Sequence, residues 1–298
     1  MSCFSQEIGL VLSGGGGKGA YEVGVWKAMQ EYGIAQKVSV ISGSSVGGLN
    51  AALFAMKELP EIESIWRDIV PNSLQVDEEG KDVLISQSGL KTIINTLPLD
   101  SITEVSYPLV NVTTVRKRFS LLKSTLNLLG FVKPGDNAFH FWLNTEDDVG
   151  EKKNLLLATS AFPFLTTPIR LKDGYEYQDG GNEIVGGDNT PIDGIVNSGY
   201  KYISNVDTIY VVYLKQNPRR VKVTDYERFN IVEIIPSVDL SGLLDGTCNF
   251  TPERINLLIN IGYQDAVNLF KSQGLHPVSS FWFTDPEPIY ETFSVLED

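Results

Sequence analysis

The chain has 298 residues, of which 42% are hydrophobic and 20% are charged, a composition typical of a soluble globular protein with a sizeable core. Its formal charge of −13 and its pI near 4.7 argue against a nucleic-acid partner, because neutralising phosphates requires clustered Lys and Arg. The same charge weakens attraction to anionic membranes.

Cysteine usage and the start of the chain bear on location. Cys3 and Cys248 provide neither a disulfide framework nor a metal-binding spacing, which favours a reducing compartment. The first residues lack the basic and apolar regions of a secretion signal, and no apolar run reaches the length of a membrane span. We therefore expect a cytoplasmic protein.

The first part of the chain alternates between strand and helix patterns. A nearly continuous apolar run at 8–13 predicts a strand covered on both faces, and helical spacing follows at 21–32, with Gly33 as its stop signal. A second strand at 38–42 precedes a second helix at 49–56. This alternation predicts a parallel sheet, in which functional groups gather at the carboxyl ends of the strands.

Later elements follow from shorter patterns. Runs rich in β-branched or apolar residues predict strands at 109–115, 154–159 and 208–214, for a sheet of about six strands. A long helix is predicted at 251–273, with a threonine and a proline at its start and Gly274 as its stop.

The region 72–150 has mixed patterns and predicts a lid or an insertion within a single domain that spans 1–298. Residues 71–103 are largely polar and predict irregular structure with one or two helices. An apolar stretch at 119–131 follows three cations. The segment 116–131 is therefore either a lid that touches a membrane or a hairpin packed on its own domain.

Two glycine-rich turns stand where a predicted strand ends and a predicted helix begins. The second, Gly43-Ser44-Ser45-Val46-Gly47, is a G-x-S-x-G elbow whose glycines allow the serine to occupy a very tight turn. The first turn places unpaired backbone N–H groups at the mouth of a helix, where they stabilise developing negative charge. It comprises Gly14, Gly15, Gly16, Gly17, Lys18 and Gly19. Together the turns predict a nucleophile and an oxyanion hole.

The first turn also fits two phosphate-binding motifs in part. Gly14-x-Gly16-x-x-Gly19 matches the dinucleotide fingerprint, but the strand at 38–42 ends without the acidic residue that binds the ribose. A Walker loop fails because Leu12 replaces its first glycine and Gly19 replaces the Ser or Thr that holds magnesium. An oxyanion hole is the preferred interpretation, and a dinucleotide-binding protein is an alternative.

A third turn, Asp179-Gly180-Gly181, supplies a carboxylate that can act as a base toward Ser45. Burial would raise the pKa of Asp179 toward the working pH. The chain has two histidines, so a Ser-Asp-His esterase is the nearest alternative. It would use His276, which follows the aspartate in the order that such hydrolases use.

The three turns resemble the motifs of the patatin-like phospholipase family, whose members carry G-G-G-x-[KR]-G, G-x-S-x-G and D-G-[GA] in that order. The run Ala-Thr-Ser-Ala-Phe-Pro at 158–163 is also similar to the segment that such proteins place before the aspartate. The resemblance is close over 8–56 and 155–191.

This resemblance implies a three-layer α/β/α fold with a mainly parallel sheet, and hydrolysis of acyl esters in glycerophospholipids by a Ser-Asp dyad without metal or cofactor. Ser45 would form the acyl-enzyme, and Asp179 would accept its proton and later activate water. The implied oxyanion hole consists of Gly15, Gly16 and Gly17, and the supporting positions are Gly14, Lys18, Gly19, Gly43, Gly47, Gly180 and Gly181.

A phospholipid substrate also implies transient contact with a membrane. The acidic chain has no evident anchor, so contact would need a patch such as 116–131, a partner or an activating ligand. Some intracellular bacterial members of the family are effectors held inactive until triggered, which makes a latent enzyme a further hypothesis. In a non-catalytic storage or interaction protein of the same fold, Ser45 would be inert.

Overall fold

The computed structural model describes residues 7–75, 84–117, 133, 135–163, 165–197, 203 and 205–278. Within these residues an eight-stranded sheet has the order β5-β6-β3-β2-β1-β7-β8, and β4 pairs with β3 beside this path. The strands are β1 (Glu7–Leu12), β2 (Val38–Ser44), β3 (Leu109–Arg116), β4 (Ala138–Trp142), β5 (Ile169–Arg170), β6 (Glu176–Asp179), β7 (Val206–Val212) and β8 (Asn230–Ile234).

The middle of the sheet is parallel, as the strand and helix alternation predicts. Strands β3, β2, β1, β7 and β8 pair in parallel, whereas β4 and β6 pair antiparallel with β3, and β5 pairs antiparallel with β6. The carboxyl ends of β1 and β2 therefore lie at the same edge, where both glycine-rich turns begin.

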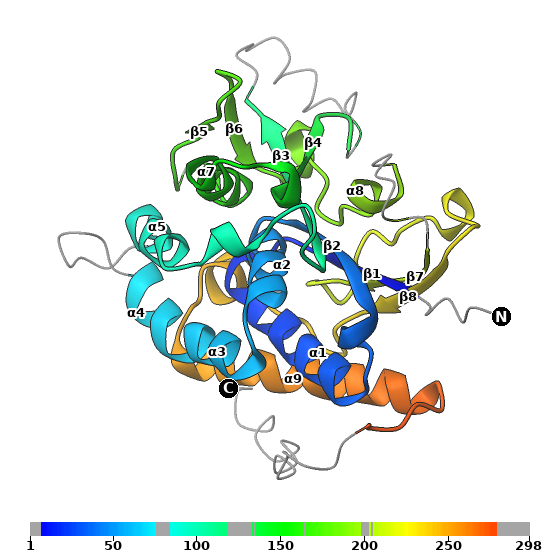
Figure 1. The fold of residues 1–298 in the computed structure, drawn as a ribbon. Helices are drawn as coiled ribbons and strands as arrows, with labels where there is room; N and C mark the ends of the chain where they lie inside the picture. The colour runs from blue at the N-terminus through cyan, green and yellow to red at the C-terminus, as the bar shows by residue number, and fades with distance from the viewer. Residues whose placement is uncertain are drawn as a thin grey trace.

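Helices cover both faces of the sheet, so the fold is a mixed α/β architecture with a central sheet (Figure 1). Alternate residues of each strand point to opposite faces. In β1, Leu10 and Leu12 belong to one apolar core and Val11 to the other. The helices are α1 (Ala20–Glu31), α2 (Val46–Met56), α3 (Leu59–Ser64), α4 (Val70–Leu74), α5 (Gln87–Asn95), α7 (Val149–Thr159), α8 (Asp193–Val196) and α9 (Pro252–Ser272).

The larger core lies on the face that carries α1, α2 and α9. Helices α1 and α9 cross closely, because a Cβ atom on Gly24 would lie 2.0 Å from the Ile259 carbonyl oxygen, and one on Gly262 would lie 2.0 Å from that of Tyr21. Helix α9 starts at Pro252 and ends before Gly274, whose φ of +75° suits a helix stop. This close crossing fixes α1, and with it the first glycine turn, against the core.

One predicted strand is wrong. Residues 154–159 belong to helix α7, which begins after Asp148, whose side chain accepts a hydrogen bond from the Gly150 amide at 2.7 Å. A short apolar run is compatible with a buried helix as well as a buried strand, because both are covered on all sides. Here Leu155, Leu156 and Leu157 are all buried within the helix. The sheet nevertheless exceeds the expected six strands, because it gains short antiparallel strands.

The region 72–150 is more than a lid or an insertion. It contributes β3 and β4 to the sheet and α5 to the helical layer beside it. The predicted helical content of 71–103 is confirmed by α4 and α5, whereas residues 76–83 and the apolar stretch at 119–131 lie outside the described residues. No described helix is long and apolar enough to cross a membrane.

Candidate active site

Ser45 forms the turn between a strand and a helix by itself. Strand β2 ends at Ser44 and α2 begins at Val46, and Ser45 has φ 55° and ψ −128°, a backbone conformation that residues with side chains rarely adopt. A Cβ atom on Gly43 would lie 2.2 Å from the Gly47 carbonyl oxygen, and one on Gly47 would lie 2.3 Å from that of Leu12. The two glycines therefore permit the elbow to approach β1.

Strand pairing brings Asp179 to this elbow. Consecutive residues of β3, Thr113 and Thr114, pair with Ser44 at the end of β2 and with Asp179 at the end of β6. A Cβ atom on Gly180 would lie 2.0 Å from the Thr113 carbonyl oxygen, so any residue with a side chain at position 180 would clash with β3. The antiparallel strand β6 thus places the Asp179 carboxylate next to the carboxyl end of the parallel strand β2.

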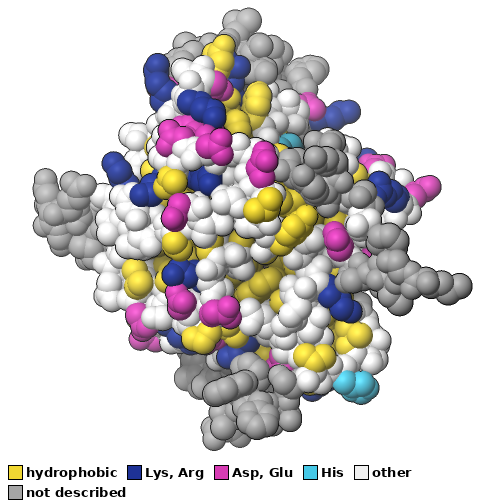
Figure 2. Space-filling view, in the orientation of Figure 1, with side chains coloured by type: hydrophobic (Ala, Val, Ile, Leu, Met, Phe, Trp, Pro, Cys, Tyr) yellow, Lys and Arg dark blue, Asp and Glu magenta, His cyan; other side chains and the backbone are white. Residues whose placement is uncertain are grey.

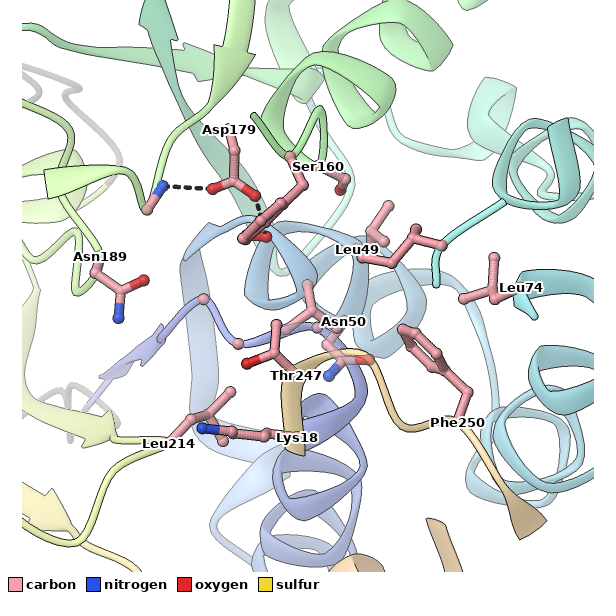
Figure 3. Close-up of a pocket in the computed structure, with 18 of the residues that line it drawn as sticks. Lys18, Leu49, Asn50, Leu74, Ser160, Asp179, Asn189, Leu214, Thr247 and Phe250 are labelled. Carbon is pink, nitrogen blue, oxygen red and sulfur yellow. Dashed lines mark hydrogen bonds between the residues drawn. The ribbon is translucent and has the colours of Figure 1, made fainter. Parts of the chain in front are cut away.

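Ser45 and Asp179 form a buried hydrogen-bonded pair (Figure 3). The Ser45 hydroxyl donates to Asp179 Oδ2 at 2.6 Å, and Asp179 Oδ1 accepts from the Gly181 amide at 2.8 Å. Ser45 is 8% exposed and Asp179 is 4% exposed. Burial raises the pKa of Asp179 to about 6, although its two hydrogen bonds oppose this shift. The carboxylate is therefore a stronger base than an exposed aspartate.

The first glycine turn faces the same space. Gly14, Gly15 and Gly16 line the cavity that contains Ser45 and Asp179. The Gly14 amide donates to the Asn189 carbonyl oxygen at 3.2 Å, whereas no described residue accepts a hydrogen bond from the Gly15 or Gly16 amide. Two free backbone donors in a cavity beside a serine hydroxyl can stabilise an oxyanion.

Gly17 and Gly19 are placed differently from the other glycines of this turn. Neither lines the cavity. A Cβ atom on Gly17 would lie 2.3 Å from the Asn249 carbonyl oxygen, and one on Gly19 would lie 2.4 Å from Val46 Cγ2. These two glycines allow the turn to pack closely against a later segment of the chain and against α2.

The cavity has a volume of about 890 Å³, within the usual range of about 300–1,000 Å³ for a ligand site. The cavity has two chemically different ends, and Figure 3 shows Leu49, Leu74 and Phe250 at one end and Lys18 at the other. One end, which we call the apolar arm, is lined by Leu49, Leu53, Ile65, Trp66, Val70, Leu74, Ile85, Leu90, Ile93, Ile94, Leu97 and Phe250. The other, which we call the polar end, is lined by Lys18, Lys215, Gln216, Asn217, Asp239, Ser241 and Thr247.

The two histidines lie in different environments. Burial lowers the pKa of His140, whose Nδ1 lies 2.9 Å from the Thr113 hydroxyl on the neighbouring strand. His276 is exposed and follows α9, where the nearby Val278 amide donates to the Glu31 carbonyl oxygen at the end of α1. Helix α1 has 12 residues and is about 18 Å long, so this contact lies far from the glycine turn at its start.

Two residues near the site, Thr159 and Asn189, belong to none of the three glycine-rich motifs. The Thr159 hydroxyl accepts a hydrogen bond from the Ser45 amide at 2.9 Å and donates to the Thr113 carbonyl oxygen at 2.5 Å, which ties the elbow to β3. Asn189 lines the cavity, and its Oδ1 would lie 2.6 Å from a Cβ atom on Gly14. Thr159 lies in the run at 158–163, which was a usable signal, whereas nothing in the sequence distinguished Asn189.

Metal-ligating side chains do not gather in the part of the chain that the structure describes: no three His, Cys, Asp or Glu residues are arranged to hold an ion there. The groups that can act chemically in the cavity include a serine hydroxyl, a carboxylate with a raised pKa, free backbone amides and two lysines.

Comparisons with known proteins agree with the motifs. The family model described as "Patatin-like phospholipase" matches residues 10–196. A lysophospholipase of Meyerozyma guilliermondii is 24% identical over 212 residues, which are 68% of this chain and 13% of that protein. A patatin-like phospholipase domain-containing protein of Caenorhabditis elegans is 50% identical over 77 residues, which are 21% of this chain and 5% of that protein.

The chain therefore spans a small part of the length of these curated relatives. Among solved structures, VipD from Legionella pneumophila has a TM-score of 0.44 at 12% identity, covering 90% of this chain and 67% of that chain. The heterodimeric complex ExoU-SpcU from Pseudomonas aeruginosa has a TM-score of 0.44 at 16% identity, covering 90% of this chain and 52% of that chain. Because the family model covers more than half of its residues, the chain belongs to the patatin-like phospholipase family.

Proposed function

We propose that this protein is a lipid acyl hydrolase that cleaves fatty-acyl esters of glycerophospholipids through a Ser45–Asp179 dyad and an acyl-enzyme. The observation that carries the proposal is the 2.6 Å hydrogen bond between these side chains in a cavity with a long apolar lining. Family membership supports the reaction class, and the names of the lysophospholipase relatives point to the same kind of ester.

The first half of the reaction forms the acyl-enzyme. Ser45 Oγ attacks the carbonyl carbon of the ester while its proton moves to Asp179 Oδ2. The carbonyl oxygen becomes negatively charged and accepts hydrogen bonds from the Gly15 and Gly16 amides. When the tetrahedral intermediate collapses, the C–O bond to the glycerol breaks, and the departing alkoxide takes the proton from Asp179.

The second half releases the fatty acid. Asp179 removes a proton from a water molecule, which attacks the acyl carbon, and the proton then passes to the departing Ser45 oxygen. A carboxylate is a weak base for either step, so the oxyanion donors have to lower the barrier substantially. Loss of one such donor reduces kcat by about 10²–10³ in other serine hydrolases.

The apolar arm suits the acyl chain. Most of its lining residues come from α2, from the segment that includes α4, and from α5, and Figure 3 shows Leu49 and Leu74 on the side of the cavity away from Lys18. Burial of a hydrocarbon chain contributes about 0.8 kcal/mol per CH₂ group, enough to select long-chain esters over acetyl esters.

Contact with the membrane would be made by the rim of the cavity. Ile184 and Leu243 both line the cavity and are 72% and 51% exposed, and the adjacent Leu244 is 62% exposed. Apolar side chains around a substrate entrance can insert into the boundary of a lipid layer. On the face in Figure 2, acidic and basic side chains are interspersed, so no large single-sign patch dominates it.

The geometry favours the dyad over a triad. Asp179 binds Ser45 directly, and the two histidines lie at the β3–β4 pairing and beyond α9. In a non-catalytic protein of this fold, nothing would require the strained backbone of Ser45.

A fluorophosphonate tests this proposal, because it reacts with activated serines whatever their substrate. We expect a mass adduct on the peptide containing Ser45, and none in a Ser45→Ala variant. An adduct without added ligand would show that the site needs no trigger. A folded protein with no adduct, either alone or with phospholipid vesicles and cell extract, would refute the dyad mechanism.

A further inference from the structure

Asn50 is a fully buried amide in the wall of the cavity (Figure 3). It lies in α2, the helix that begins at the Ser45 elbow. Its Nδ2 donates a hydrogen bond to the Gly19 carbonyl oxygen at 3.0 Å, at the end of the first glycine turn. Its Oδ1 accepts a hydrogen bond from Trp66 Nε1 at 3.0 Å, and Trp66 lines the apolar arm. One side chain therefore links the nucleophile helix, the glycine turn and the acyl-chain site.

Glu22 completes the hydrogen bonds of this amide. Asn50 Nδ2 also donates to Glu22 Oε2 at 2.8 Å, so both hydrogens of the amide group are used. Glu22 is fully buried in the first turn of α1, the helix that directly follows the glycine turn. Burial raises the pKa of Glu22 well above its usual value, so the carboxyl group is neutral near pH 7 and needs no counter-ion. The Asn50 side chain is thus held in one orientation.

Trp66 contacts the glycine turn directly as well as through Asn50. A Cβ atom on Gly19 would lie 3.1 Å from Trp66 Cη2, so the indole ring packs against the end of the turn. Trp66 is buried and belongs to a π-helical segment at Ile65–Ile69, a rare helical form that is frequent at functional sites. The apolar arm and the glycine turn therefore share this side chain as a common wall.

The position of the glycine turn decides whether its free amides can act. The Gly15 and Gly16 amides stabilise an oxyanion only when they lie about 2.7–3.1 Å from it. On one side the turn is packed against a later segment, because a Cβ atom on Gly16 would lie 2.3 Å from the Thr247 carbonyl oxygen. On the side of α2, Asn50 binds the last carbonyl of the turn. A displacement of about 1 Å in a catalytic group can reduce the rate by about 10²-fold.

We propose that Asn50, oriented by Glu22 and Trp66, is a positioning residue that holds the glycine turn at the distance from Ser45 at which the turn binds the oxyanion. The inference rests on the proposed function, because it takes the free amides of the turn as the oxyanion hole. Asn50 acts through the turn and not on the reacting atoms. Its loss should therefore weaken binding of the transition state more than binding of the ester, which lowers kcat and leaves KM nearly unchanged.

Steady-state kinetics with a soluble ester test this split. We expect Asn50→Ala to lower kcat by about ten- to hundred-fold and to change KM by less than about three-fold. Trp66→Phe removes a single donor and keeps an aromatic ring in the arm, so kcat should fall by about three- to ten-fold. Glu22→Ala should also lower kcat, and Glu22→Gln should restore it, because glutamine keeps an acceptor for the Asn50 amide.

Asn144→Ala is the matched control for the loss of a buried amide. Asn144 is 1% exposed, accepts a hydrogen bond from the Val110 amide at 2.7 Å and donates one to the Thr103 carbonyl oxygen at 2.9 Å. It does not line the cavity. This variant should lose stability in urea, as Asn50→Ala does, and should keep the wild-type kcat. An equal loss of kcat in both variants would overturn the positioning role.

Binding of an alkyl trifluoromethyl ketone separates this inference from the proposed function. Ser45 Oγ adds to the ketone carbon as the C=O π bond opens and the serine proton moves to Asp179, which leaves an oxyanion like that of the transition state. The matching alcohol has no carbonyl group and fills the same space. We expect Asn50→Ala to weaken binding of the ketone by about the factor lost in kcat and to leave binding of the alcohol unchanged.

The outcomes of this comparison differ for the two proposals. Equal losses for ketone and alcohol, or no loss for either, would overturn the positioning role of Asn50 while Ser45 remains a working nucleophile. A wild-type protein that binds the ketone no better than the alcohol would instead refute the proposed function. If Asn50→Ala does not fold, the same comparison in Trp66→Phe decides, because this variant removes one hydrogen bond of the Asn50 amide.

Discussion

The dependence of activity on pH is the strongest test of the dyad, because replacing only two histidines gives a variant without any imidazole group. The pKa of Asp179 is raised to about 6 by burial, and the carboxylate must be ionised to accept the Ser45 proton. Activity should therefore rise with pH. The ionised fraction is about one-tenth at pH 5, one-half at pH 6 and nine-tenths at pH 7, and kcat/KM follows this fraction of the free enzyme.

Imidazole groups could produce a similar curve in the wild-type protein. His140 is half-buried, and its burial lowers its pKa from the usual value near 6.5. The chain has two histidines, so the double variant His140→Asn/His276→Ala contains no imidazole at all. The amide side chain introduced by His140→Asn offers a polar atom to the Thr113 hydroxyl, which bonds to Nδ1 of His140 in the wild-type protein.

The assay is hydrolysis of a soluble short-chain ester from pH 4.5 to pH 8.5 at constant ionic strength. We expect the histidine-free variant to keep at least about one-third of wild-type kcat/KM and to retain an inflection near pH 6. A flat profile, or an inflection that disappears with the histidines, would refute a carboxylate base. Loss of turnover in His276→Ala alone would instead support the triad esterase.

Three further predictions concern the cavity and its surroundings. Leu74→Trp fills the part of the apolar arm that Figure 3 shows beyond Leu49. We expect kcat/KM to fall at least about ten-fold more for 16-carbon esters than for 4-carbon esters, and Leu74→Met is the volume-conserving control. Ile184→Ser combined with Leu244→Ser should reduce hydrolysis of zwitterionic vesicles several-fold and leave hydrolysis of a soluble ester unchanged; equal losses would contradict a membrane-facing rim. Glu22 is fully buried and its pKa is raised well above its usual value, so Glu22→Gln should stabilise the protein at pH 8 more than at pH 4.5, as measured by urea unfolding.

Much of the site could be predicted because its signals are local. A tight turn restricts which residues can flank a serine, so Gly43 and Gly47 identify the elbow without knowledge of the fold. The carboxylate was harder, because Asp-Gly-Gly is also a common hairpin turn. Asp179 lies 134 residues from Ser45, and the antiparallel pairing of β6 with β3 brings them together.

Other features depend on long-range packing that no local pattern records. The apolar run at 154–159 predicts a strand but lies in helix α7, because three consecutive leucines show no periodicity that would distinguish a buried strand from a buried helix. The apolar arm combines residues of α2 with residues of α5, which come from separate parts of the chain. The burial of Lys18 likewise depends on distant segments, because Gly246 approaches Lys18 so closely that a Cβ atom on Gly246 would lie 2.6 Å from Lys18 Cε. The sequence thus predicted Ser45 and Asp179 as the candidate reacting groups, whereas the shape of the cavity around them depends on the packing of distant segments.

The raised pKa that would suit Asp179 to act as a base should also destabilise the fold. Its pKa is 3.8 when unperturbed and about 6 in the folded protein, so folding becomes less favourable as pH rises from about 4 to 6, and above pH 6 the full penalty of about 3 kcal/mol applies. Asp179→Asn keeps an acceptor for the Gly181 amide and removes the ionisable group. It should therefore be more stable than the wild-type protein by about 3 kcal/mol at pH 8 and of equal stability near pH 4, while losing turnover. Urea unfolding at both pH values measures the difference. A stability gain that is the same at pH 4 and pH 8 would show that packing, and not ionisation of the Asp179 carboxyl, accounts for it.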